Sequence, residues 1–271
     1  MLSRSFVVVP VLMSVVMVLL VSAAVKGGSP CASEFGTLLG YANDVPAYSN
    51  CNDEHTSWES HFVDHDHGHT AEPIDDHFEV GMKWQCVEYA RRYLFLKEHV
   101  AFGDVDSAFH IWDLKYVYPR KLLAEDKTVR NEKPDNGVPL QRFQNGRTRF
   151  SPIMNDILIW RQQEGMPHGH IAVVVGMHVG ENGDHFVEIA EQNHDSLPWG
   201  VKNYSRALLL TDNRQGVNVP NPPHIPLTFR LHDPDGKEIL GWMRGQIHGP
   251  NEWREHEAHL DGSPEASLGD L

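Results

Sequence analysis

Hydrophobic residues are unevenly distributed along the chain, and their longest run lies near its start. No charged residue occurs from Phe6 to Val25, and Arg4 precedes this run. A basic flank followed by roughly twenty apolar residues is typical of an export signal, and this length also suffices to cross ~30 Å of hydrocarbon. We therefore expect residues 1–30 to be a signal peptide or a retained membrane anchor. Either one directs the chain into the secretory pathway, secreted or anchored with its remainder on the lumenal or extracellular side.

The next segment is polar and shows no hydrophobic period. Asp, Glu, Ser, Thr and His dominate from Asn50 to His77, with the cluster His65-Asp66-His67-Gly68-His69 in the middle. Such a composition predicts a long surface loop or a partly disordered insertion, the His-rich loop of residues 50–80. We expect ordered structure to resume near Met82.

Two later segments have a helical pattern. Residues from Gln85 to Glu98 include neither Gly nor Pro, and their apolar positions recur at helical spacing from Cys86 onward. This predicts a helix that begins at Cys86. A weaker helical pattern runs from Ala108 to Leu123 and is interrupted by Pro119.

The remaining apolar runs are short and β-branched, and turns rich in Gly, Asn and Asp separate them. They predict an antiparallel meander and a later strand that closes the sheet. The order of helices before strands predicts an α+β domain over residues 31–247, followed by a disordered polar tail at 248–271. The four predicted strands are Asp156–Trp160, His170–Gly176, His185–Glu191 and Ile239–Arg244.

Composition narrows the possible partners. The 271 residues carry 23 Lys and Arg against 37 Asp and Glu, a formal charge of −14. Nucleic acid and anionic membrane surfaces require basic patches, so we expect neither as a partner. We expect a monomer that contacts membranes only through residues 6–25, and a neutral or cationic substrate.

The chain has three cysteines. Cys31 and Cys51 can pair in an oxidising compartment, which would leave Cys86 alone. A lone thiol in an exported protein is a catalytic nucleophile, an intermolecular bridge or an inert buried side chain.

The position of Cys86 favours the first of these roles. A thiol attacks as the thiolate, which the start of a helix and a nearby imidazole both stabilise. His170 opens an apolar strand, where its ring can reach a helix packed on the sheet. Glu191 and Asn193 lie at the end of the next strand, and either can orient the imidazole.

Five motifs of this sequence resemble those of a known family. They are similar to the signatures of the amidase domain of glutathionylspermidine synthetase/amidase and trypanothione synthetase, within the CHAP superfamily of cysteine amidases and peptidases. The motifs, in chain order, are Phe35–Tyr41, Lys83–Arg92, Gly169–Val174, Ile189–Asn193 and Leu240–Trp242.

The resemblance implies a papain-like fold, with an N-terminal catalytic helix packed on an antiparallel β-sheet. It also implies hydrolysis of the amide between the glycine carboxyl of glutathione and a polyamine, or of a small peptide amide, with no metal or organic cofactor. Cys86 matches the nucleophile, His170 the base and Glu191 the third residue, with Asn193 as the reserve for that role. Arg91 matches a substrate-binding position, and Gln85 is a candidate for the oxyanion site.

Three other functions remain open. An exported CHAP endopeptidase can meet the D-alanyl-glycyl bonds of peptidoglycan. A non-catalytic CHAP module can serve as an ectodomain. The His and Asp residues from His61 to His77 are ligand types that suit Zn²⁺ or Cu²⁺, although their spacing defines no structural site.

Overall fold

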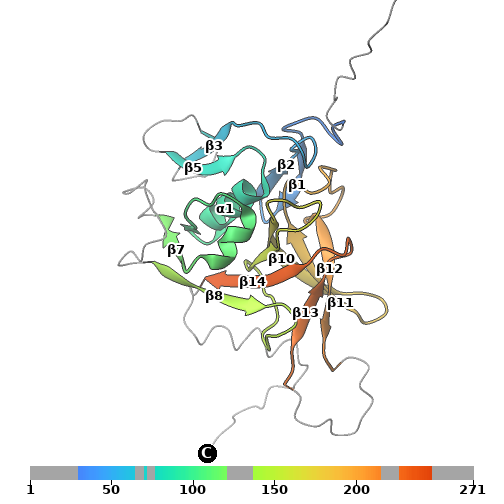
Figure 1. Ribbon diagram of the computed structural model, residues 1–271. Helices are drawn as coiled ribbons and strands as arrows, with labels where there is room; N and C mark the ends of the chain where they lie inside the picture. The colour runs from blue at the N-terminus through green and yellow to red at the C-terminus, as the bar shows by residue number, and fades with distance from the viewer. Residues whose placement is uncertain (1–29, 65–69, 72–76, 121–136, 215–225, 246–271) are drawn as a thin grey trace, which may run out of the picture.

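The computed structural model describes residues 30–64, 70–71, 77–120, 137–214 and 226–245 (Figure 1). These residues form one α-helix, one 3₁₀ helix and a series of short strands. The elements are β1 Leu38–Ala42, β2 Val45–Tyr48, β3 Ser60–Asp64, β4 Thr70–Ala71, β5 His77–Met82, α1 Cys86–Lys97, β6 Val100–Ala101, η1 Ala108–Asp113, β7 Tyr116–Pro119, β8 Val138–Gln144, β9 Ile157–Trp160, β10 His170–Val179, β11 His185–Ala190, β12 Arg206–Asp212, β13 Phe229–His232 and β14 Ile239–Gly245.

A large antiparallel sheet dominates the structure. Its strand order is β13-β12-β11-β10-β9-β14-β8-β7-β6, and all neighbouring strands run antiparallel. The central strands are buried on both faces, which explains their continuous apolar sequence: all four residues of β9 are buried, as are the first six of β10. The predicted α+β class and the four predicted strands are confirmed. The last predicted strand, Ile239–Arg244, corresponds to β14, which lies inside the sheet between β9 and β8.

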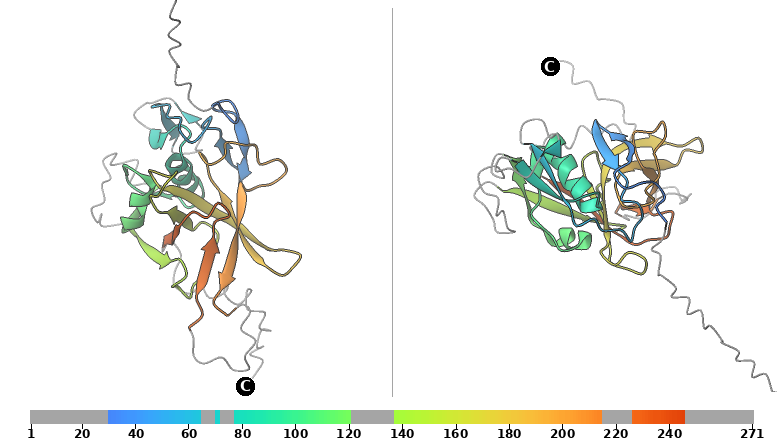
Figure 2. Two further views of the ribbon diagram at one scale, coloured as in Figure 1. Left: turned by 45° about the vertical axis from the view of Figure 1, so that its right-hand side comes forward. Right: turned by 90° about the horizontal axis from the view of Figure 1, so that it is seen from above.

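The helix α1 lies between the large sheet and the small sheet of β3, β4 and β5 (Figures 1 and 2). It contacts β10 on one side and β5 and β6 on others. Because it is covered on several sides, its buried residues include the charged Glu88, Arg91 and Arg92 beside the apolar ones. The predicted helix is confirmed, and it begins at Cys86.

The prediction of a loop from Asn50 to His77 is wrong in part. Strands β3 and β5 pair antiparallel within this region and just beyond it. Residues alternate along β3, with His61 and Val63 buried and their neighbours partly exposed. The polar composition concealed this alternation because His61 is a buried polar residue. Residues 65–69 and 72–76 lie outside the described part of the chain.

The prediction of a helix from Ala108 to Leu123, interrupted by Pro119, is wrong in part. Within residues 108–119, Ala108–Asp113 forms the 3₁₀ helix η1 and Tyr116–Pro119 forms the strand β7. Aromatic and β-branched residues favour a strand here, and proline cannot continue a helix. Residues 121–136 are not among those described.

The predicted pairing of Cys31 with Cys51 is confirmed by a disulfide that joins the segment before β1 to the segment after β2. The expected export segment and tail lie outside the described residues and remain predictions. Among the residues that are described, no helix has both the length and the apolar character required to cross a membrane.

Candidate active site

Cys86 lies at the first position of α1 and is the one cysteine outside the disulfide. The residue is 8% exposed and belongs to the hydrophobic core cluster. Gln85 precedes the helix in an extended conformation. The first backbone N–H groups of a helix have no partner within the helix, so hydrogen-bond donors surround the thiol.

His170 is the first residue of β10 and pairs with Trp160 of β9. Gly169, which precedes it, has a φ of +62°, and a Cβ there would lie 2.6 Å from the Trp160 carbonyl oxygen and 2.8 Å from Phe109 Cβ. Glycine is thus required for the chain to enter β10 this closely against β9 and η1. The turn fixes the direction in which the imidazole leaves the sheet.

The imidazole of His170 lies between Glu191 and Cys86. Its Nε2 is 2.8 Å from Glu191 Oε2, which leaves Nδ1 for the thiol. Burial opposes the charged imidazolium, but the charge and hydrogen bond of Cys86 and those of Glu191 outweigh burial and raise the pKa of His170 to about 9. This arrangement favours the charged imidazolium form of His170.

Glu191 is held by its own set of partners. Arg206 Nε lies 2.7 Å from Glu191 Oε1, and the Ser205 hydroxyl donates to the same oxygen at 3.0 Å. Arg206 Nη1 also contacts Asp233 at 3.2 Å. Burial acts to raise the pKa of Glu191, but Arg206 and His170 hold it well below its usual range. The carboxylate is therefore ionised and oriented, and no sequence pattern indicated the contacts of Ser205 and Arg206 with it.

Asn193 does not share the position of Glu191. Its amide nitrogen donates to Gln85 Oε1 at 2.7 Å, and its oxygen accepts from Asn50 at 3.0 Å. The amide nitrogen of Gln85 in turn donates to Asn50 Oδ1 and to the His55 carbonyl. The structure thus brings Glu191 to His170, and places Asn193 and Gln85 in a network that fixes the residue before Cys86.

Arg91 lies on α1 with its guanidinium buried. It donates to the Gly103 carbonyl at 2.8 Å, forms a 2.9 Å ion pair with Asp104 and lies over the ring of Phe102. Burial lowers its pKa. These contacts connect the helix to the segment before η1, and the substrate-binding roles of Arg91 and Gln85 stay predictions.

A buried polar network on the other side of α1 was not foreseen. Glu88 is fully buried, with Oε1 at 2.8 Å from His61 Nδ1 and 2.6 Å from Arg92 Nε, and with Gln192 Nε2 at 2.8 Å from Oε2. Burial acts to raise the pKa of Glu88, but Arg92 and His61 lower it to about 2. Gln192 directly follows Glu191, so this network ties the end of β11 to the helix that carries Cys86.

We expect the Glu88→Gln variant to lose about 3–5 kcal/mol of unfolding free energy, because it leaves buried Arg92 without a counter-charge. The folded pKa of about 2 lies below the ordinary 4.5, so this contribution is present above pH 4.5 and is lost as pH falls toward 2. Urea unfolding at pH 7 and pH 3 measures both effects.

Glu188→Gln is the matched control for that prediction. Glu188 also lies 2.8 Å from a histidine, but its partner His178 is 40% exposed. We expect the Glu188→Gln substitution to lower the unfolding free energy by less than about 1 kcal/mol. Equal costs for the two variants would contradict a stabilising role of the buried network.

Metal ligation finds no support in the described part of the chain, where no group of three or more His, Cys, Asp or Glu residues is placed to hold an ion. His61, the first of the candidate ligands from His61 to His77, lies instead against Glu88, with 2.8 Å between His61 Nδ1 and Glu88 Oε1. Most of the remaining segment is outside the described residues.

Comparison with known proteins identifies the domain. Residues 77–193 match the model of the CHAP domain, and this part of the chain is a CHAP domain. The match runs from β5 through Asn193 and so includes α1, Cys86, His170 and Glu191.

The chain is also similar to larger enzymes. It is 35% identical over 223 residues to the bifunctional glutathionylspermidine synthetase/amidase of Escherichia coli (strain K12), covering 80% of this chain and 30% of that protein. It is 32% identical over 211 residues to the trypanothione synthetase of Crithidia fasciculata, covering 75% of this chain and 27% of that protein. The chain therefore spans less than a third of the length of these relatives. At a coarse level, the domain and the relatives support hydrolysis of an amide bond.

Proposed function

We propose that this protein is a cysteine amidohydrolase that cleaves an amide through an acyl-enzyme, with a glutathionylspermidine-like conjugate or a small peptide amide as substrate. The observation that carries the proposal is the placement of His170 between the Cys86 thiol and the buried Glu191 carboxylate. An inert buried cysteine needs neither neighbour.

In the acylation step, the Cys86 thiolate attacks the carbonyl carbon of the amide. The carbonyl oxygen becomes negative, and the unpaired N–H groups at the start of α1, that of Cys86 among them, donate to it. The His170 imidazolium gives its proton to the amide nitrogen as the C–N bond breaks. The amine leaves, and a thioester remains on Cys86.

In the deacylation step, His170 is neutral and takes a proton from water. The resulting hydroxide attacks the thioester carbon, and the C–S bond breaks. The carboxylic acid product leaves and releases its proton to solvent. His170 keeps the proton taken from water, which restores the thiolate–imidazolium pair. α1 is thus the catalytic helix of a papain-like layout, packed on the strand that carries the base.

Glu191 acts through His170 and is a positioning residue, and Arg206 positions Glu191 in turn. We expect Arg206→Gln to lower kcat by about 10²-fold with little change in KM, because small displacements of catalytic groups cost about this much. Arg206→Lys should recover part of the loss. Steady-state kinetics measure the split, and Arg142→Gln, which changes an exposed arginine on β8, serves as the control. An unchanged kcat in Arg206→Gln would contradict the positioning role.

The charge of the surface beside η1 supports a cationic leaving group. A pocket of about 390 Å³ there is lined by three aspartates, Asp104, Asp106 and Asp113, together with His110 and Lys115. Two of these aspartates form ion pairs, Asp104 with Arg91 and Asp113 with Arg142. The same segment packs against the entry to β10, since the Ser107 hydroxyl lies 3.0 Å from His168 Nδ1 and Phe109 N–H donates to the His168 carbonyl. The lining side chains include three carboxylates and one ammonium group, so we expect this pocket to attract the amine portion of a polyamine conjugate.

The experiment that tests the function compares hydrolysis of glutathionylspermidine and of a D-alanyl-glycyl peptide by the same preparation. Release of spermidine, absent in the Cys86→Ala variant, supports the proposal. Hydrolysis of the peptide alone would change the assigned substrate but leave the proposed mechanism in place. Hydrolysis of neither, or hydrolysis undiminished in Cys86→Ala, would overturn the proposed function.

A further inference from the structure

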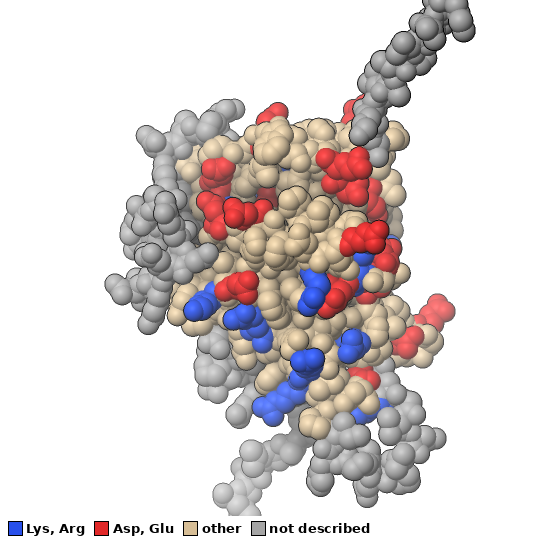
Figure 3. All heavy atoms as spheres, viewed as in Figure 1, with Lys and Arg blue, Asp and Glu red and all other residues tan. Residues whose placement is uncertain are grey.

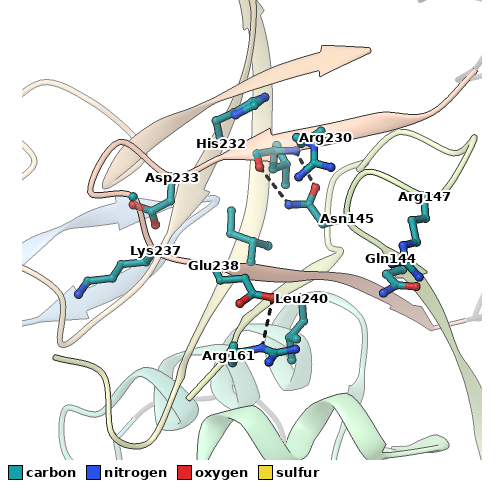
Figure 4. A pocket seen from close by; sticks show the side chains of 13 residues that line it. Gln144, Asn145, Arg147, Arg161, Arg230, His232, Asp233, Lys237, Glu238 and Leu240 are labelled. Atoms are coloured by element: carbon teal, nitrogen blue, oxygen red, sulfur yellow. Dashed lines mark hydrogen bonds and ion pairs between the residues drawn. The ribbon is translucent and has the colours of Figure 1, made fainter. Parts of the chain in front are cut away.

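A second pocket lies away from Cys86, where the turn after β8 meets β13 and β14. It has a volume of about 420 Å³ (Figure 4). Its lining includes four permanent cations, Arg147, Arg161, Arg230 and Lys237. In a chain with a net charge of −14 this concentration is unusual. Figure 3 shows basic side chains gathered over the lower part of one face, where β8 and β13 run, while acidic ones gather above them.

The two carboxylates that line the pocket are already engaged. Glu238 forms a 3.2 Å ion pair with Arg161. The Asp233 side chain is 1% exposed and accepts from Trp160 Nε1 at 2.6 Å and from Arg206 at 3.2 Å. Neither carboxylate therefore neutralises the remaining cations.

Three cations keep uncompensated charge. Lys237 Nζ donates to a neutral group, the Glu164 carbonyl, at 2.8 Å. Among the residues that the structure describes, neither Arg147 nor Arg230 has a carboxylate partner. His232 adds no charge near neutral pH, because burial and Arg230 lower its pKa.

Hydrogen bonds and close packing hold the turn after β8, which carries Arg147, against β13, which carries Arg230. Asn145 accepts from the Leu231 N–H at 2.8 Å and donates to the Leu231 carbonyl at 3.0 Å. Gly146, at a φ of +72°, lies directly under the Arg230 guanidinium, since a Cβ there would come within 2.5 Å of Arg230 Nη2. The turn is therefore fixed to β13, and it supports one guanidinium while presenting a second from Arg147.

We propose that this pocket is an anion-binding site, distinct from the catalytic site, that takes a small molecule with two or more adjacent phosphate or carboxylate groups. Two guanidiniums and an ammonium around one cavity match such a ligand, because guanidinium binds these groups through paired hydrogen bonds. A volume of about 420 Å³ accommodates a small organic anion. Asp233 connects one wall of the pocket to Arg206, but Arg147 and Arg230 are not among the residues that hold Cys86, His170 or Glu191.

Calorimetric titration of the full chain with pyrophosphate and with tricarballylate, at constant ionic strength, tests the proposal. We expect one equivalent of at least one probe to bind, and the double variant Arg147→Gln/Arg230→Gln to weaken that binding at least tenfold. The double variant Arg142→Gln/Arg149→Gln is the matched control, since it removes the same charge from arginines outside the pocket. Amide hydrolysis should be unchanged in both.

Each outcome of that titration is decisive. A greater loss of binding in Arg147→Gln/Arg230→Gln than in the control variant supports the site. The probe that binds more tightly shows whether phosphate or carboxylate is the recognised group. No saturable binding of either probe would overturn the proposal. Equal weakening in the two double variants would also overturn it, because it would show only a general response to net charge.

Discussion

Replacing Cys86 with alanine should reduce amide hydrolysis by about four orders of magnitude or more, to the rate left by the binding site and the oxyanion donors alone. The reason is that no other group in the site can form the acyl intermediate, since Cys31 and Cys51 are joined in a disulfide. Initial rates at saturating substrate measure the loss. Thermal unfolding should show a folded variant, because alanine removes only one sulfur atom from the edge of the core.

The alanine variant also changes a quantity that a structural role of Cys86 would not. The charge and hydrogen bond of Cys86, together with those of Glu191, act against burial and raise the pKa of His170. We therefore expect the pKa of His170 to fall from about 9 in Cys86→Ala, as read from the imidazole signals by NMR. An unchanged pKa and an unchanged rate would contradict the role of nucleophile.

Replacing His170 with glutamine should reduce hydrolysis by about three orders of magnitude, because the leaving amine would lack its proton donor and water its base. In the wild-type protein, the pKa of about 9 keeps the imidazolium populated below pH 9. Acylation should therefore decline as pH rises through 9. A pH–rate profile measured on both proteins tests this, and a His170→Gln rate within tenfold of wild type would contradict it.

The same pKa predicts how stability depends on pH. The folded value of about 9 lies above the ordinary 6.5, so the stability contributed by the His170 pair is fully present below pH 6.5 and is lost as pH rises through 9. His170→Gln removes this dependence. Urea unfolding at pH 6 and pH 10 measures it, and the partly exposed His185 serves as the control position.

The sequence predicted the elements whose signal is local. The helix from Cys86 was readable because fourteen successive residues of the predicted segment lack Gly and Pro, and the central strands were readable as apolar β-branched runs. The strand β3 could not be predicted in this way, because the segment around it is polar and its buried positions include the polar residue His61. The one pattern that indicated a strand in this segment was the alternation of the buried His61 and Val63 with partly exposed neighbours.

The sequence allowed Cys86 and His170 to be predicted, but not the residues that hold Glu191 in place. Cys86 and His170 carry recognisable chemistry, and their motifs resemble those of a family. Arg206 reaches Glu191 only through the pairing of β11 with β12, in which Ile189 lies opposite Arg206. Such a contact depends on strand register across an irregular loop. Glu88 and Arg92 read as an ordinary surface pair at helical spacing, and only tertiary packing shows that both are buried.

Trapping the intermediate tests the proposed chemistry at its essential step. The protein is mixed with glutathionylspermidine, quenched with acid during turnover and digested for mass spectrometry. We expect the peptide that contains Cys86 to carry the mass of a glutathionyl thioester, and the adduct to be absent from Cys86→Ala. Spermidine release without any adduct on Cys86, at a rate that the alanine variant retains, would contradict the acyl-enzyme mechanism.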